Sequence, residues 1–359
     1  MAAEYLDIDL NFQHEVIAEM FRRERMIRDR ANPFVMYDDL DFLDRFRLSK
    51  AGVIELMRIV GNHLDEGRRS INIPPMMQLL VTLRYFATGS YLRLVGDSFG
   101  MHITTVSNIV KKVSRSIASQ RAMDIHYPDE RQRLNTQQQF FRLCRIPGII
   151  GAIDCTHIPI ISPGGQNAEI FRNRKGFFSI NVQAVCDFDL YFTNIVARWP
   201  GSSHDSRIFD NSALAADLAS GALQGVLLGD NGYGLKSYLL TSVLSPQTAA
   251  ERRFNAHLSR GRVKIENAFG VLKRRFSCLT LDLRLKVTTS LIVIIACAVL
   301  HNFSKQFEIP LPQEADIRDC REEVHTVPIN RNEGGRALRN FLIRRFEQVL
   351  IKYLKHNSY

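Results

Sequence analysis

A change in the pattern of apolar residues near Ile149 constrains the fold more than any other feature of the sequence. Before it, apolar residues recur at three and four positions, as in amphipathic helices, whereas short runs rich in β-branched residues follow it. A helical pattern over 205–218 separates the third of these runs from the fourth. We therefore expect one α/β layer, with strands over 149–154, 179–186, 191–197 and 225–230.

Two of the predicted strands end in an aspartate, Asp154 and Asp230. Ligand sites in open sheets collect at the carboxyl ends of strands. A third carboxylate, Glu266, lies in a helix predicted over 260–276. Three converging carboxylates without a thiolate or paired histidines favour Mg²⁺ or Mn²⁺ over zinc. Two such ions can stabilise the attacking and leaving oxygens of an in-line displacement at phosphorus.

The same predicted helix lies in the most basic part of the chain. Ten Lys and Arg stand against three acidic residues between 251 and 286, and the net charge of the whole chain is +10. At about 100° per residue, Arg262, Glu266 and Lys273 lie within about 40° of one helix face. A solvated basic helix is the alternative explanation, but the presence in this run of a lone Glu aligned with the two strand-end aspartates favours a substrate-binding face. We predict DNA contacts from Arg262, Lys273, Arg274 and Arg275.

Residues 74–119 carry a helix-turn-helix pattern. Pro75 can open a helix that Gly89 closes, a short helix follows over 91–99, and a longer one over 104–119. In that geometry the last helix lies in the major groove of DNA. Its outward residues, predicted to contact DNA, are Thr105, Ser107, Asn108, Lys111, Lys112 and Arg115. A plain three-helix subdomain is the alternative.

Composition excludes several classes of protein. The chain has 359 residues, of which 45% are hydrophobic, so global disorder is excluded. Its first ten residues carry carboxylates where a signal peptide needs positive charge, and the apolar run 291–300 is too short to span a bilayer of about 30 Å. The six cysteines form no CxxC pair. We expect no membrane association, a buried helix near 290–303, and a reducing compartment, cytosol or nucleus.

Five motifs in this order resemble the PIF/Harbinger superfamily of DDE transposases over residues 70–305: 151–157 (GAIDCTH), 200–207 (PGSSHDSR), 229–233 (GDNGY), 265–276 (IENAFGVLKRRF) and 300–302 (LHN). The resemblance implies an RNase H-like catalytic core with a mixed sheet flanked by helices. It implies that Asp154, Asp230 and Glu266 hold two divalent cations for DNA nicking and strand transfer. Asp205 is the alternative second aspartate or an auxiliary metal ligand. We prefer Asp230, because the second carboxylate of such a core belongs at the end of the fourth strand.

The implied activity is that of a DNA transposase, which cleaves transposon ends and joins the 3′-hydroxyls to target DNA by two-metal phosphoryl transfer. The alternatives are a domesticated DNA-binding or nuclease protein without transposition, and a regulator that binds DNA through residues 74–119. The resemblance also implies a separately encoded Myb-like partner that brings the protein to the nucleus; without it the protein would stay cytoplasmic. We expect a homo-oligomer when two ends are synapsed. His157 and His204 are expected to be hydrogen-bonded structural residues.

The predicted organisation has five segments. A helical arm covers 1–60 and includes a basic cluster over 22–30, which fits either a solvated helix or an arm that meets nucleic acid or a partner. The other segments are a helix-turn-helix-like DNA-binding domain over 61–135, the RNase H-like catalytic domain over 136–306, an acidic linker over 307–333 and a C-terminal amphipathic helix over 334–359.

Overall fold

Five strands form one mixed sheet in the order β3-β2-β1-β4-β5. In this sheet β1 pairs antiparallel with β2 and parallel with β4, β2 pairs antiparallel with β3, and β4 pairs parallel with β5. Their bounds are β1 Ile149–Pro159, β2 Ser179–Cys186, β3 Phe192–Pro200, β4 Val226–Leu228 and β5 Leu239–Leu240. The four predicted strands are confirmed. The two residues of β5 form too short an apolar run to be predicted. This topology, with helices on both faces, is the RNase H-like core that we expected.

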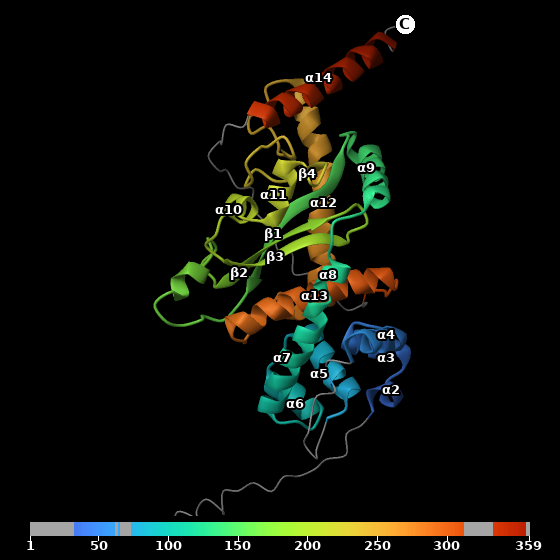
Figure 1. Cartoon of the computed structure of the whole chain (residues 1–359), viewed down its shortest axis with the longest axis vertical. Coiled ribbons are helices and arrows are strands. Elements are labelled where there is room, and N and C mark those ends of the chain that lie inside the picture. Colours follow the sequence, from blue (N-terminus) through green and yellow to red (C-terminus); the bar gives the residue numbers. More distant parts are fainter. Residues whose placement is uncertain (1–31, 62–63, 65–72, 312–332, 357–359) are drawn as a thin grey trace, which may run out of the picture. The chain divides into compact units, whose positions relative to one another are not determined.

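The computed structural model describes residues 32–61, 64, 73–311 and 333–356. The described residues from Pro33 onward belong to one compact unit, whose helices and strands are drawn in Figure 1. The predicted basic cluster over 22–30 and most of the acidic linker lie outside the described residues. The division into five segments therefore stays a prediction.

Each face of the sheet is covered by a different group of helices. Ile153 and Cys155 of β1 belong to a buried cluster with residues of α10 (Asp205–Asp210) and α11 (Ala213–Ser220). Ala152 and Ile158 alternate with them and belong to the larger core, with α9 (Glu130–Cys144) and α12 (Ala249–Arg275). The single helix predicted over 205–218 is two helices, because the Ser212 hydroxyl caps α11 at Ala215 N–H (3.2 Å) and so starts a new helix.

The long helix α12 runs along the sheet and packs against β1, β2 and β4 (Figure 1). It begins at a capping box formed by Thr248 and Glu251, eleven residues before the predicted start. A Cβ atom on Gly261 would overlap the end of the Leu228 side chain of β4, so the glycine lets the helix approach this strand without displacing that side chain.

The predicted helix-turn-helix pattern is present in the helices before the sheet. Pro75 opens the first helix of the pattern and Gly89 ends it in the left-handed region (φ 62°). The second helix is followed by Gly100, also left-handed (φ 61°), and the third ends at Ser119 as predicted. The helices of this part are α2 Pro33–Met36, α3 Asp39–Phe46, α4 Lys50–Val60, α5 Pro75–Thr88, α6 Leu92–Ser98, α7 Ile103–Ser119 and α8 Arg121–Asp124.

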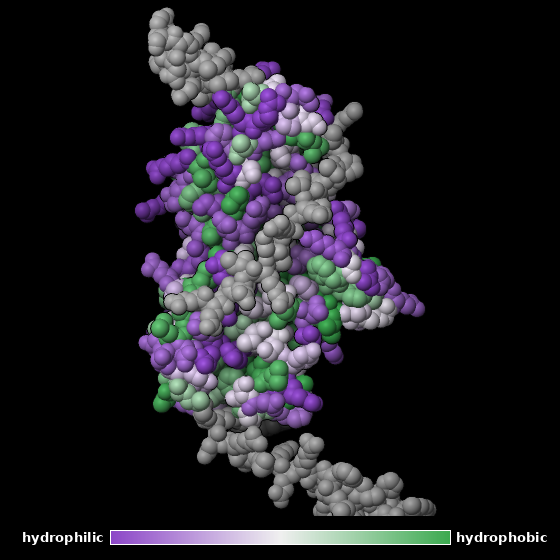
Figure 2. All heavy atoms as spheres, turned by 180° about the vertical axis from the view of Figure 1, so that it is seen from behind, coloured by the Kyte–Doolittle hydropathy of each residue, from purple (hydrophilic) through white to green (hydrophobic). Residues whose placement is uncertain are grey.

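Helix α13 (Val287–Gln306) joins the helical part to the sheet, since it packs against α7, α8, α12 and β3. By length and composition it is the one described helix that could cross a membrane, but 72% of its apolar window is buried inside the protein. The prediction of a buried core helix is therefore confirmed. The remaining elements are η2 Ala168–Phe171, η3 Ser277–Leu279 and α14 Glu333–His356, which packs on α12. Figure 2 shows the opposite side, where hydrophilic side chains predominate in the upper part of the view.

Candidate active site

The register between β1 and β4 brings Asp154 and Asp230 together. Ala152 pairs with Leu228 in parallel, and each aspartate lies two residues further along its strand direction. Neighbouring strands are about 4.8 Å apart, so the two side chains are adjacent. Asp154 is 5% exposed and lies within β1, which continues to Pro159, rather than at the end of a strand as predicted. It lies instead just beyond the part of β1 that pairs with β4.

Asp205 joins the two aspartates in one acidic cluster. One carboxylate oxygen from each of Asp154, Asp205 and Asp230 lies within 4.8 Å of the others. Asp205 is the first residue of α10, and its Oδ1 accepts a hydrogen bond from Asn181 Nδ2 of β2 (3.0 Å). The same amide nitrogen donates to the carbonyl of Ser203 (2.9 Å), so β2 fixes the backbone before Asp205 as well as its side chain.

Gly232 makes room for this cluster. Its N–H donates to Asp230 Oδ1 (2.9 Å), and a Cβ atom on it would lie 3.0 Å from that oxygen and 3.3 Å from Asp205 Oδ2. Beside the cluster, the Tyr233 hydroxyl meets the Cys155 thiol (3.3 Å). Burial, reinforced by the charge of Asp205, raises the pKa of both groups well above their usual values. Both groups are therefore neutral at neutral pH.

The donor set fits a hard divalent cation. Three carboxylates supply oxygens only, which suits Mg²⁺ or Mn²⁺. Ligands of Mg²⁺ lie about 2.0–2.1 Å from the ion, so opposite ligands are about 4 Å apart. Neighbouring ligands of an octahedral ion are about 2.9 Å apart, so three oxygens within 4.8 Å of one another can surround one ion after their side chains move closer together.

Glu266 is linked to the cluster through an arginine. Arg262 Nη2 lies 3.5 Å from Asp154 Oδ2 and 3.7 Å from Glu266 Oε1, and the Glu266 side chain is half exposed. The structure thus brings Asp154 and Asp230 together with Asp205, and places Glu266 beyond Arg262. Lys273, on the same helix face, donates to the Thr156 hydroxyl of β1, so the predicted shared face of α12 is present and meets β1.

Arg275 requires a correction to the predicted DNA-contacting set. It is 3% exposed, and its guanidinium donates to the carbonyls of Arg47 (2.8 Å), Ile309 (2.7 Å) and Pro310 (3.1 Å). Burial lowers its pKa to about 10, which leaves it charged at neutral pH. Arg275 therefore holds the end of α12 to neighbouring segments, whereas Arg274 is half-buried at the surface.

On α7, the predicted outward residues divide into two groups. Asn108, Lys111 and Arg115 are exposed, and their spacing places them on one face. Thr105 and Ser107 are partly exposed, whereas the ammonium group of Lys112 donates to the carbonyl of Leu64 (2.7 Å). Lys112 is thus engaged within the protein.

The sequence alone assigns no role to Asn181, although this residue holds Asp205. The available signal is the alternation of polar Ser179, Asn181 and Gln183 with apolar residues in strand β2, where Asn181 is 1% exposed. The two expected structural histidines are hydrogen-bonded, His157 Nδ1 to the Ser179 hydroxyl (2.9 Å) and His204 Nδ1 to Arg174.

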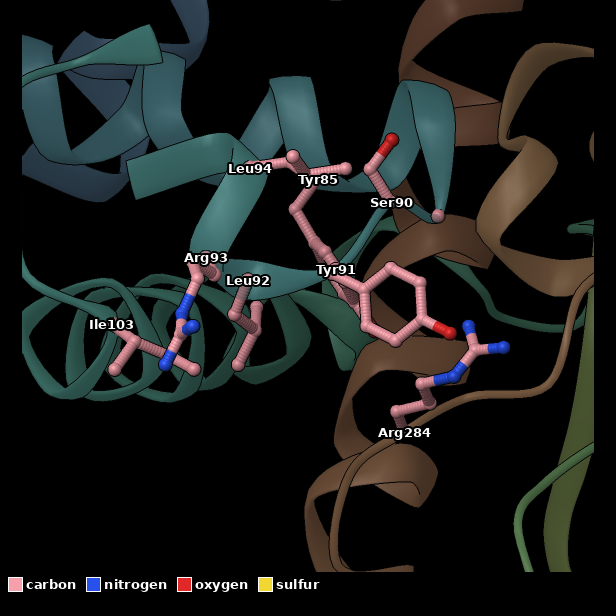
Figure 3. Close-up of a pocket in the computed structure, with 9 residues that line it drawn as sticks. Tyr85, Ser90, Tyr91, Leu92, Arg93, Leu94, Ile103 and Arg284 are labelled. Atoms are coloured by element: carbon pink, nitrogen blue, oxygen red, sulfur yellow. The ribbon is translucent and has the colours of Figure 1, made fainter. Parts of the chain in front are cut away.

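A separate pocket of about 470 Å³ lies between α5, α6, the start of α7 and Arg284 (Figure 3). Its lining is mostly apolar, and the Arg284 guanidinium stacks 4.3 Å from the centre of the Tyr91 ring. No carboxylate lines it.

Residues 153–302 match the family described as DDE superfamily endonuclease, a range that contains Asp154, Asp205, Asp230 and Glu266. The cattle (Bos taurus) protein "Putative nuclease HARBI1" is 32% identical over 275 residues, which cover 74% of this chain and 78% of that protein. "Protein ALP1-like" of Arabidopsis thaliana is 26% identical over 274 residues, 68% of this chain and 66% of that protein. No solved structure matches the chain. The chain therefore belongs to the Harbinger transposase-derived nucleases of the DDE superfamily.

Proposed function

We propose that this protein is a metal-dependent DNA endonuclease whose cleavage site is the acidic cluster. The observation that carries this is the convergence of three carboxylate oxygens within 4.8 Å, with the Arg262 guanidinium beside Asp154. Carboxylates beside a cation suit a phosphodiester, which needs both a metal site and a contact for its own negative charge.

In this proposal Asp154, Asp205 and Asp230 hold divalent cations, Mg²⁺ or Mn²⁺, and Glu266 adds a fourth carboxylate. Two bound cations would lower the pKa of water and offset charge on the attacking and leaving oxygens. Asn181 and Gly232 keep Asp205 and Asp230 in place. Arg262 and Lys273 hold the DNA phosphates against the sheet.

The bond changes follow from an in-line displacement. A water oxygen forms a bond to phosphorus while the bond from phosphorus to the 3′-oxygen breaks, which leaves a 3′-hydroxyl and a 5′-phosphate. In a transposase, the 3′-hydroxyl then attacks a target phosphodiester in the same way. The second candidate, a nuclease that cuts without joining, is favoured by the names of the animal relatives, which are described as putative nucleases.

DNA recognition is proposed for α7, whose exposed face carries Asn108, Lys111 and Arg115. Beyond the cleavage site, we infer from the family a Myb-like partner protein, a nuclear location that depends on it, and a homo-oligomer that holds two DNA ends. Imaging of the tagged protein in cells with and without a Myb-like protein tests the location. A distribution that is the same in both cases would contradict it.

Substitution of the acidic cluster, and of Glu266 beside it, tests the proposed activity. Asp154→Asn, Asp205→Asn, Asp230→Asn and Glu266→Gln remove one charge each with little change of shape. We expect each to lower Mg²⁺-dependent cleavage of terminal-repeat DNA by orders of magnitude, because each removes a ligand. Asp282→Asn, at an exposed position outside the cluster, is the matched control and should cleave normally.

Two further measurements complete the test. EDTA should abolish cleavage and added Mg²⁺ or Mn²⁺ should restore it. Joined products in the presence of target DNA would identify a transposase, whereas cut but unjoined ends would identify a nuclease. Cleavage that survives Asp154→Asn would exclude the acidic cluster as the site.

A further inference from the structure

A second group of basic side chains lies at the Asp205 end of the acidic cluster. Arg174, from the segment between β1 and β2, donates to His204 Nδ1, and His204 directly precedes Asp205. Arg207 follows His204 by three residues on α10, so the two side chains are neighbours on the helix surface. All three are at least partly exposed. We call Arg174, His204 and Arg207 the Asp205-side group.

The segment that carries Arg174 is firmly anchored. The buried Asn173 donates to the Ser179 hydroxyl (3.1 Å) and accepts from the N–H of Lys175 (3.0 Å). The N–H of Ser202 donates to the carbonyl of Ile170 (3.1 Å), which ties this segment to the connection between β3 and α10. Arg174 therefore projects from a fixed turn and contacts His204, the residue before Asp205.

Arg207 is also held in place. Its guanidinium carbon lies 5.6 Å from the centre of the Trp199 ring, within the range of a cation–π contact. Trp199 of β3 pairs in register with Asn181, the residue that binds Asp205. The same strand pair thus supports both Arg207 and the carboxylate of Asp205.

A comparison with Arg172 shows what is unusual about this group. Arg172 lies two residues before Arg174, but it forms an ion pair with Glu169 (2.7 Å) and stacks on Phe178 (4.3 Å). In the part of the chain that the structure describes, neither Arg174 nor Arg207 forms an ion pair with a carboxylate. Arg172 serves the fold of the segment, whereas the charges of Arg174 and Arg207 stay available to a ligand.

The ligand must be compatible with the acidic cluster. Three close carboxylates repel a polyanion, and cations on one side of them would hold it at one point only. Helix α12 supplies Arg262, which contacts Asp154, and the Asp205-side group supplies cations next to a different carboxylate of the cluster, Asp205. A chain of phosphates that passes the carboxylates can contact both.

We propose that Arg174 and Arg207, with His204 between them, form a phosphate-binding subsite for the DNA strand on the Asp205 side of the cleavage site. Its place in catalysis rests on the proposed nuclease function, but its binding of DNA does not. Arg174 and Arg207 are positioning residues that hold the strand across the carboxylates. The subsite is a third place of DNA contact, in addition to those predicted on α12 and on α7.

The salt dependence of DNA binding tests this directly. The full-length protein is titrated with a labelled 30-base-pair duplex by fluorescence anisotropy, in EDTA to prevent cleavage, from 50 to 200 mM KCl. Removal of one phosphate-binding cation should reduce the slope of log K against log salt by about 0.9. We expect this reduction for Arg174→Ala, about twice this reduction for Arg174→Ala/Arg207→Ala, and the wild-type slope for Arg174→Lys.

Two controls distinguish the removal of a phosphate-binding cation from a disturbed fold or a lower net charge. Glu169→Gln/Arg172→Gln removes the neighbouring ion pair without changing net charge, and Arg58→Ala removes an exposed cation from α4. Both should keep the wild-type slope. If Arg174→Ala also keeps the wild-type slope, or if the controls reduce it as much, the subsite does not exist. Because cleavage is not measured, these outcomes are independent of the Asp154→Asn test.

Discussion

Two helices carry the predicted DNA contacts, α7 and α12, and their basic side chains have different partners. On α7, Lys111 and Arg115 are exposed. On α12, Arg262 reaches Asp154, and Arg275 is buried against three carbonyls. The number of cations on a helix therefore does not show whether they meet solvent, the active site or the backbone.

The difference follows from how each helix is packed. The described contacts of α7 are with helices on its apolar side, so its polar face stays in solvent. The longer α12 contacts the sheet as well as α9, α13 and α14, and its cations lie close to strand residues. We infer that α7 contributes to DNA affinity, whereas Arg262 contributes to the rate of cleavage.

The largest expected effect is that of Arg262→Ala on the rate. Removal of one preorganised contact to a reacting oxyanion costs about 10²–10³ in rate in other enzymes, and we expect a decrease of this size in single-turnover cleavage. The affinity for duplex DNA should change by much less. Arg260→Ala, an exposed cation on the same helix, is the control and should cleave at the wild-type rate. Equal decreases in the two variants would show that α12 acts only through its bulk charge.

The parts of the fold that were predicted correctly depend on local signals. Pro75 and Gly89 mark the ends of α5, because proline fits the first helical turn and glycine the left-handed residue after the last. The strands were recognisable from short apolar runs, and Asp154 and Asp230 from their place in those runs. Such signals do not depend on the rest of the chain.

The rest depends on contacts between distant segments. Asp205 belongs to the cluster because Asn181, 24 residues away in sequence, holds its side chain. Arg262 meets Asp154 because α12 packs against β1, a strand that lies about a hundred residues earlier in the sequence. Neither of these contacts can be identified from periodicity, because periodicity shows which face of a helix or strand is buried but not which segment packs against that face. The burial of Arg275 was missed for the same reason.

The next largest effect concerns α13, which packs on both α7 and β3 and so connects the helical part of the protein to the sheet. His301 of α13 is 1% exposed, and its Nε2 lies 2.8 Å from the carbonyl of Leu190. Burial lowers its pKa from 6.5 to about 4. As pH falls from 6.5 to about 4, the unfolded chain binds a proton that the folded protein resists, so stability falls by about 3 kcal/mol.

Urea unfolding between pH 7 and pH 4.5 measures this fall in the free energy of unfolding. His301→Phe should flatten the fall in stability, because the titrating group is gone. Asp187 has the opposite effect on the pH dependence of stability. Burial raises its pKa to about 6, so as pH falls the folded protein binds this proton before the unfolded chain does and gains stability. Asp187→Asn should therefore steepen the fall. An unchanged pH dependence in His301→Phe would show that another group destabilises the protein in acid.

The smallest effect is expected on α7, and it decides the comparison with α12. Lys111→Ala and Arg115→Ala should each weaken binding of any duplex severalfold and lower the salt slope by about 0.9, without changing the cleavage rate of bound DNA. Lys112→Ala is the matched control, because its ammonium group is bound to the carbonyl of Leu64 and should add nothing to the slope. If all three variants keep the wild-type slope, α7 does not contact DNA, and the helix-turn-helix pattern serves packing alone. A slope lowered only in Lys111→Ala and Arg115→Ala would separate the two helices by role, with α7 holding the duplex and α12 acting on the bond that breaks.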